Sequence, residues 1–180
     1  MAITRLGGAN AISGAITSSN LPTGSVLQVV SATKTDTQVS STATFVDVSG
    51  LSLSITPLST SNKIFLVCNI NIDGTSRYFG LKFVRGSTDI GIGDADGSRT
   101  RLTVSSMRNS SATLDNYIMH NSSASFLDTP NTTSATTYKI QAGKHYGTAS
   151  NLYINRPEFD DNSSYITRGI STLTAYEIVG

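Results

Sequence analysis

The stretch KIFLVCNINI, residues 63–72, decides the fold class of this chain. Its apolar residues occupy every second position: Ile64, Leu66, Cys68, Ile70 and Ile72. Side chains two residues apart in a β-strand point to the same face of a sheet, so the pattern predicts a strand with one face in a hydrophobic core. Cys68 falls on that face, which predicts a small buried side chain rather than a reactive thiol.

Further strands are predicted on both sides of this one. In RYFGLKFVR, residues 77–85, Phe79, Leu81 and Phe83 share a face in the same way. Strand signals alternate with turn signals at the short spacing expected of a sandwich or barrel. The strands are expected over residues 25–31, 38–48, 51–56, 63–72, 77–85, 88–92, 99–107, 123–127, 136–141, 151–155 and 171–179. The turns are expected at 49–50, 73–74, 85–86, 96–97 and 160–162, and no helix or parallel βαβ rhythm is recognised.

The composition agrees with an all-β protein that has many turns. Charged residues make up 14% of the 180 residues, against a typical value of about 25%. The net charge is +1, which argues against a nucleic-acid partner, and no apolar run is long enough to span a membrane. The chain has 1 cysteine, so it forms no internal disulfide.

Residues 1–24 differ from the rest of the chain and predict an N-terminal arm. They are rich in Gly, Ala, Ser and Asn, and their glycines disfavour a stable helix. Residues 1–13 lack the pattern of a signal peptide, so we expect the protein to be made in a cytoplasm. We therefore expect an anchoring arm over 1–24 and a β-sandwich domain over 25–180. The apolar residues expected to dock the arm on a neighbouring protein are Ile3, Leu6, Ile12, Ile16 and Leu21.

Two predicted strands are apolar on both faces, which indicates that each is covered twice. In 171–179, Tyr176 and Ile178 follow Ile170 on one face, and the other face is also apolar. The second cover comes either from a partner subunit, as in sandwiches that trimerise around an inner sheet, or from a third layer of loops. The residues predicted at a subunit interface are Phe65, Val67, Leu173, Ala175 and Val179.

The sequence carries little that predicts catalysis, and we expect no catalytic residue, no cofactor and no bound metal. His120 and His145 lie in polar, turn-like contexts outside any zinc-ligand spacing, which predicts surface histidines. No Gly-x-Ser-x-Gly elbow is present. Asp94-x-Asp96-Gly97 begins like a calcium loop but lacks its closing glutamate. A hairpin turn is expected there, with a calcium site completed by other loops as the alternative.

Sugar binding is a second hypothesis, placed in the loops over 86–98, 107–122 and 142–162. Paired carboxylates that cleave glycosides would have to come from Asp94, Asp96, Glu158, Asp160 and Asp161, all in predicted loops. The absence of tryptophan from the sequence weakens both a lectin and a glycosidase. The aromatic residues that either stack on a sugar or pack in the protein are Tyr146, Tyr153, Phe159 and Tyr165.

Several stretches, in this order, resemble a family of small structural proteins from marine tailed phages that infect cyanobacteria and pelagic bacteria. The stretches are SVLQVVSATKTDT (25–37), LSLSITPLSTSNKI (51–64), VRGSTDIGIGDADGSR (84–99), SFLDTPNTTSATTYKIQ (125–141), and YINR, DDNSSY and RGISTLTAYEI within 153–178. Members are described as tail-fibre-like or virion structural proteins.

The resemblance implies a trimeric jelly roll like those of fibre heads and of C1q- or TNF-like domains. It implies a virion protein, assembled in the host cytoplasm as a fibre, a knob or a head decoration. The partners would be other copies of the chain, capsid or tail proteins bound through the arm, and a host-surface glycan. A carbohydrate-binding receptor module is the alternative, ahead of a polysaccharide depolymerase. The resemblance carries over no functional residue.

Overall fold

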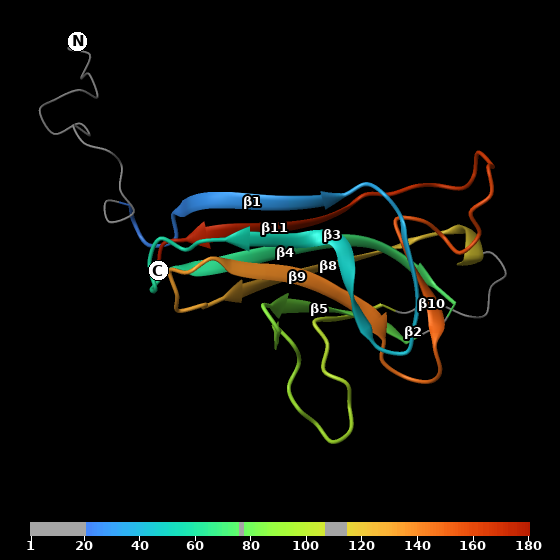
Figure 1. Cartoon of the computed structure of the whole chain (residues 1–180), viewed down its shortest axis with the longest axis horizontal. Coiled ribbons are helices and arrows are strands. Elements are labelled where there is room, and N and C mark those ends of the chain that lie inside the picture. Colours follow the sequence, from blue (N-terminus) through green and yellow to red (C-terminus); the bar gives the residue numbers. More distant parts are fainter. Residues whose placement is uncertain (1–20, 76–77, 107–114) are drawn as a thin grey trace, which may run out of the picture.

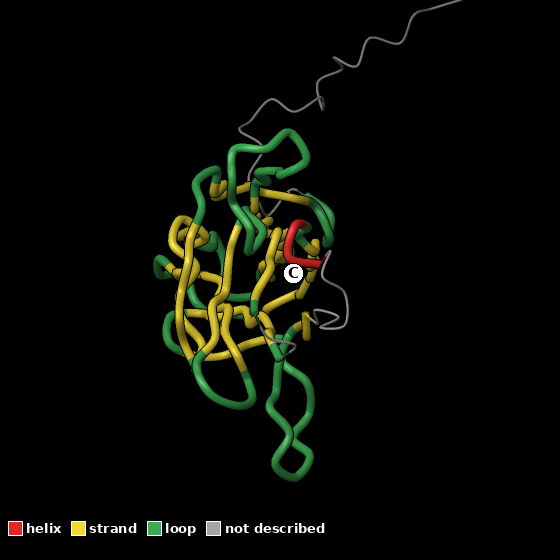
Figure 2. Tube along the Cα trace, turned by 90° about the vertical axis from the view of Figure 1, so that its right-hand side faces the viewer, coloured by secondary structure: helices red, strands yellow, loops and turns green. Residues whose placement is uncertain are grey.

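The computed structural model describes residues 21–75, 78–106 and 115–180, which form two antiparallel β-sheets packed face to face (Figure 1, Figure 2). The strands are β1 (Val26–Lys34), β2 (Gln38–Thr42), β3 (Phe45–Ile55), β4 (Lys63–Gly74), β5 (Phe79–Arg85), β6 (Thr88–Ile90), β7 (Val104–Ser106), β8 (His120–Asp128), β9 (Thr136–Lys144), β10 (Ser150–Ile154) and β11 (Ser171–Ile178). A short 3-10 helix, η2, spans Asp115–Tyr117. The predicted all-β, antiparallel sandwich is confirmed.

The strand order is that of a jelly roll. The first sheet runs β1-β11-β4-β8, and β10 and β2 extend it beside the far part of β4. The second sheet runs β3-β9-β5-β6, with β7 also paired to β5. Each sheet therefore takes strands from both halves of the chain, and the first strand pairs with the last, as in double-sheet jelly rolls.

The core lies between the sheets and is built from alternate residues of the strands. Ile64, Leu66 and Ile70 of β4 are fully buried, as the alternation predicts. Tyr138 of β9 and Phe83 of β5 belong to the same buried cluster from the second sheet. The predicted buried position of Cys68 is confirmed, and this burial raises the pKa of its thiol to about 12. A thiol held protonated in this way is a packing residue.

The segment predicted as one strand over 38–48 is two strands, β2 and β3, separated by Ala43 and Thr44. The turn predicted at 49–50 is instead a bulge inside β3, where the register with β9 shifts between Asp47 and Ser52. Gly50 adopts a φ of 80° at this bulge, a conformation that residues with a Cβ avoid. The bulge resembles a turn in the sequence because both features use the same residue types.

The turn predicted at 73–74 is also wrong. Asp73 and Gly74 lie at the end of β4 and pair with Tyr153 and Leu152 of β10. Asp73 is buried there and accepts hydrogen bonds from the backbone amides of Gly74 and Glu158, at 2.7 Å each. Of the strand predicted over 99–107, the described residues 99–106 form a strand only at β7, because residues 99–103 belong to a loop that projects from the sandwich (Figure 1, Figure 2).

The sandwich has two distinct ends. At the proximal end, residues 21–25 and the C-terminus lie together, and the backbone amide of Gly24 donates to the carbonyl of Val179 at 2.9 Å (Figure 1). At the distal end, β4 and β9 finish and β5 and β8 begin. The turns predicted at 85–86 and 96–97 are confirmed by Gly86 and Gly97, with φ of 60° and 54°.

Candidate functional site

The outward face of the sheet β1-β11-β4-β8, called here the outer face, carries a row of large apolar side chains. Val29 pairs with Tyr176, Tyr176 with Phe65, and Phe65 with Leu127, so one residue from each strand joins the row. Val29 is 53% exposed and Leu127 is 46% exposed. The Phe65 and Tyr176 rings lie 6.2 Å apart between centroids. A continuous apolar row is therefore left open across this sheet.

Two further rows beside it are small and uncharged. They consist of Ser31, Thr174, Val67 and Ser125, and of Thr33, Thr172, Asn69 and Ser123. The hydroxyls of Ser31 and Thr174 lie 3.0 Å apart, and that of Ser123 donates to Asn69 at 2.6 Å. Depletion of charge together with an apolar row is typical of the centre of a protein–protein interface.

The predicted interface residues divide between the two faces. Phe65 and Val67 lie on the outer face, as expected, and are half-buried. Leu173 and Ala175 do not lie there: both are fully buried in the core. Val179 follows the end of β11 and is half-buried at the proximal end. Both faces of β11 are apolar in the sequence, and only the packing of the two sheets selects which one points inward.

The outer-face residues that the sequence pattern does not identify are Val29, Tyr176 and Leu127. The alternation places Tyr176 on one face of its strand but does not assign it to the interface. The signal for all three is their place in the row that passes through Phe65, which depends on strand register rather than on local pattern. Of the predicted arm residues, Ile3, Leu6, Ile12 and Ile16 lie outside the described residues. Leu21 lines a cavity of about 320 Å³ at the proximal end, with Asn62 and Val179.

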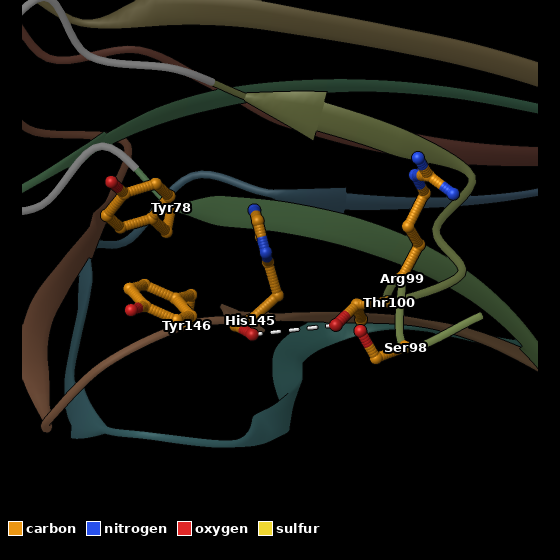
Figure 3. A pocket seen from close by; sticks show the side chains of 6 residues that line it. All are labelled: Tyr78, Ser98, Arg99, Thr100, His145 and Tyr146. Carbon is orange, nitrogen blue, oxygen red and sulfur yellow. Dashed lines mark hydrogen bonds between the residues drawn. The ribbon is translucent and has the colours of Figure 1, made fainter. Parts of the chain in front are cut away.

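A second candidate surface is a cleft at the distal end, here called the distal cleft (Figure 3). Its volume is about 530 Å³. The residues that line it are Tyr78, Ser98, Arg99, Thr100, His145 and Tyr146. Tyr78 precedes β5, His145 and Tyr146 follow β9, and the others come from the loop between β6 and β7. The antiparallel pairing of β5 with β9 brings these segments together.

The aromatic wall of the cleft is held by defined contacts. The Tyr78 ring lies 5.1 Å from that of Tyr146 and 5.8 Å from that of His145, both edge to face. The backbone amide of His145 donates to the carbonyl of Tyr78 at 2.8 Å. On the opposite wall, the Thr100 hydroxyl reaches the carbonyl of His145 at 3.5 Å. In Figure 3 the His145 ring stands between the two tyrosines and Arg99.

The charges around the cleft balance. Arg99 forms an ion pair with Asp96, three residues earlier in the same loop. The loop between β6 and β7 also contains Asp94 and Arg101, so its two carboxylates and two guanidinium groups cancel. Gly93 accepts a hydrogen bond from the Arg101 side chain. In the loop that begins like a calcium site, Arg99 therefore binds the Asp96 carboxylate and Arg101 binds the backbone of Gly93.

The remaining predicted carboxylates lie in the loop between β10 and β11, where one of them, Asp160, forms ion pairs. Asp160 pairs with Arg156 at 3.2 Å and with Arg168 at 2.6 Å. Glu158 and Asp161 lie in this loop too, whereas Asp94 and Asp96 lie in the loop before β7. Over the described ranges, no group of three or more His, Cys, Asp or Glu side chains is placed to hold a metal ion.

The other histidine and aromatic residues singled out in the sequence lie partly in the interior and partly on the surface. His120 is not in a turn: it begins β8, is half-buried and pairs with Ile72. Tyr153 is buried. Phe159 and Tyr165 are exposed and pack with Tyr117 of η2, the ring centroids lying 5.0 and 5.8 Å from that of Tyr117.

No protein-family model and no curated protein matches the chain. Among solved structures, the chain is similar to the crystal structure of the infectious bursal disease virus VP2 subviral particle, with 14% sequence identity and a TM-score of 0.39. The match covers 85% of this chain and 38% of that chain, so the present chain spans well under half of its length. In the described part of the chain, no helix is long and apolar enough to cross a membrane. The class defined by fold and surfaces is a jelly-roll β-sandwich whose outer sheet face carries an apolar row.

Proposed function

We propose that this chain is a structural subunit of a virus particle: a homotrimer of jelly-roll domains, anchored by residues 1–24 and exposed for attachment to the host surface. The observation that carries the proposal is the apolar row on the outer face, flanked on one side by two rows without charge. The resemblance of the sequence to virion proteins of marine tailed phages supports the viral setting. The proposal assigns the protein a structural and attachment role and no catalysis.

The outer face favours self-association for a physical reason. Val29 and Leu127 keep about half of their surface in water, although burying an apolar side chain is worth roughly 25 cal/mol per Å². The rows of Val67 and Asn69 carry only uncharged side chains, so no charge has to be desolvated when another sheet covers them. On the other side of the apolar row, the exposed Lys63 can keep its ammonium group in water. A closed cyclic assembly covers this face in every copy and leaves none of the copies open to further addition. Three copies around the β1-β11-β4-β8 sheet meet this requirement.

The proposed arrangement also separates anchoring from attachment. Residues 21–25 lie at the proximal end, so the arms of all copies leave the trimer on one side when its axis runs along the strands. The distal cleft then lies at the opposite end, turned away from the particle. Apolar arm residues bind a neighbouring virion protein by filling pockets on it, as extended segments do in other assemblies.

The Phe65→Glu variant tests the trimer. The wild-type protein is expected to show three times the chain mass of 19.0 kDa by light scattering. Phe65→Glu is expected to be monomeric at micromolar concentration, because it places a charge in the centre of the apolar row. Phe159→Glu is the matched control: it makes the same change at an exposed distal position, and the trimer is expected to survive it. A wild-type protein that stays monomeric would contradict the proposed assembly.

A full-length variant tests the anchoring role of the arm. We expect incorporation into particles to fall by at least about tenfold, since each lost apolar plug weakens docking. The residues changed to serine are Ile3, Leu6, Ile12, Ile16 and Leu21. The matched control changes polar arm residues to alanine: Thr4, Asn10, Ser13, Thr17 and Ser18. Quantitative mass spectrometry of purified particles measures incorporation, and light scattering should show the trimer intact. Normal incorporation of the serine variant would exclude this anchor.

A further inference from the structure

We propose that the distal cleft binds an uncharged sugar unit of a host-surface glycan. This inference rests on the proposed function, which places the distal end away from the particle. It adds the site and the chemical class of the ligand. The aromatic rings, the polar groups and the charge balance of the cleft each support it.

The aromatic wall presents ring surface that the fold itself does not bury. Tyr146 is 68% exposed and Tyr78 is 39% exposed. Because the contacts between these rings are edge to face, the rings stand at an angle and line the cleft from two directions. The face of an aromatic ring carries negative charge density and attracts the positive edge of C–H groups. The C–H groups on one side of a pyranose ring supply such an edge, so a sugar can pack against this wall.

The opposite wall supplies hydrogen-bonding groups. Ser98 and Thr100 offer hydroxyls that both donate and accept, and Arg99 offers donors only. Sugar hydroxyls also donate and accept, so these side chains can pair with both the donor and the acceptor functions of a sugar. The cleft volume of about 530 Å³ falls within the range of about 300–1,000 Å³ found for small-molecule sites. A cleft with one aromatic wall and one hydroxyl-bearing wall matches the two-faced chemistry of a sugar.

The charges favour a neutral ligand. Arg99 is already paired with Asp96, and the loop as a whole has as many carboxylates as guanidinium groups. An acidic sugar would have to displace Asp96 from Arg99 and would meet its carboxylate nearby. A neutral sugar accepts hydrogen bonds from Arg99 without breaking that ion pair.

The two walls are also held in place before any ligand binds. The bond from the His145 amide to the Tyr78 carbonyl joins the aromatic segments, and the contact between Thr100 and His145 joins the loop to them. Within the loop, the Gly93 amide donates to the carbonyl of Leu102 at 3.2 Å. A site that is ordered in advance loses less conformational entropy on binding.

The test uses saturation-transfer NMR on the full-length protein with the methyl glycosides of glucose, galactose, mannose and N-acetylglucosamine. At least one of these is expected to bind with a dissociation constant on the order of 1 mM, which corresponds to the weak binding of a small ligand in an open cleft. Tyr146→Ala is expected to weaken that binding by at least about tenfold, since it removes the most exposed ring of the wall. Tyr165→Ala removes a similarly exposed distal tyrosine outside the cleft and is expected to change the affinity by less than about twofold.

Several outcomes would overturn the inference. They are silence of all four glycosides, binding restricted to acidic sugars such as galacturonic acid, and equal effects of Tyr146→Ala and Tyr165→Ala. The trimer mass and the particle incorporation are measured on the same variants. If the protein is a trimer and enters particles but binds no sugar, the proposed glycan site is contradicted and the proposed assembly is not. If the protein is a monomer and binds sugar at the cleft, the proposed assembly is contradicted and the glycan site is supported.

Discussion

Replacing Glu177 with alanine is expected to lower the free energy of unfolding by about 3–5 kcal/mol, because it leaves the buried Asn62 amide and two part-buried donors without this acceptor. The Glu177 side chain is fully buried in β11. Its carboxylate accepts three hydrogen bonds of 2.6 Å each, from the side chains of Gln28 and Asn62 and from the backbone amide of Leu58. It thereby joins β1, β11 and the connection between β3 and β4. Urea denaturation followed by circular dichroism measures the loss.

Glu177→Gln is the matched variant for this experiment. The amide keeps the volume and one acceptor oxygen, which can still serve the Leu58 amide and the Asn62 side chain. Its NH₂ group faces Gln28, where one hydrogen bond is lost. The cost is therefore expected to be about 1–2 kcal/mol, clearly below that of alanine. Equal costs for Gln and Ala, or an alanine cost below about 1 kcal/mol, would show that the buried hydrogen bonds are not what holds this end together.

The second large effect is expected at Asp128, a buried polar link between the two sheets. Asp128 of β8 is buried and accepts hydrogen bonds from Arg85 at 2.8 and 2.9 Å and from the Tyr138 hydroxyl at 2.6 Å. Asp128→Ala leaves a partly buried guanidinium and a fully buried hydroxyl without their partner. Breaking a buried pair from one side costs about 3–5 kcal/mol. Because Arg85 is 31% exposed and is partly served by water, we expect about 3 kcal/mol by urea denaturation.

A double-mutant cycle with Tyr138→Phe separates the contributions at Asp128. Burial, together with the hydrogen bond to Asp128, holds the pKa of Tyr138 well above its usual value, so the hydroxyl stays protonated and keeps donating. Once Tyr138 has lost its hydroxyl, Asp128→Ala should cost about 1 kcal/mol less, since no buried donor is then left unpaired. Additive costs in the cycle would show that Tyr138 and Asp128 do not depend on each other.

The distal cleft could be foreseen only in part. The loops expected to face a sugar, 86–98 and 142–162, contain Ser98 and Tyr146, which line the cleft. Tyr78 and Thr100 fall outside those ranges, and the sequence pattern predicts a strand at Thr100. The pairing of β5 with β9 brings Tyr78 beside His145. No local pattern shows this pairing, because the two residues are far apart in the sequence.

The residues of KIFLVCNINI by themselves determined a strand with one core face, because side-chain alternation is a local property of extended backbone. The same property could not choose between the two apolar faces of β11. The sandwich places Leu173 and Ala175 inside and Tyr176 outside, since the other sheet covers only one face. Tertiary structure alone also decided that Glu177 and Asp128 are buried. A polar side chain is tolerated inside only where distant residues supply its hydrogen bonds, and those partners meet it only in the folded chain.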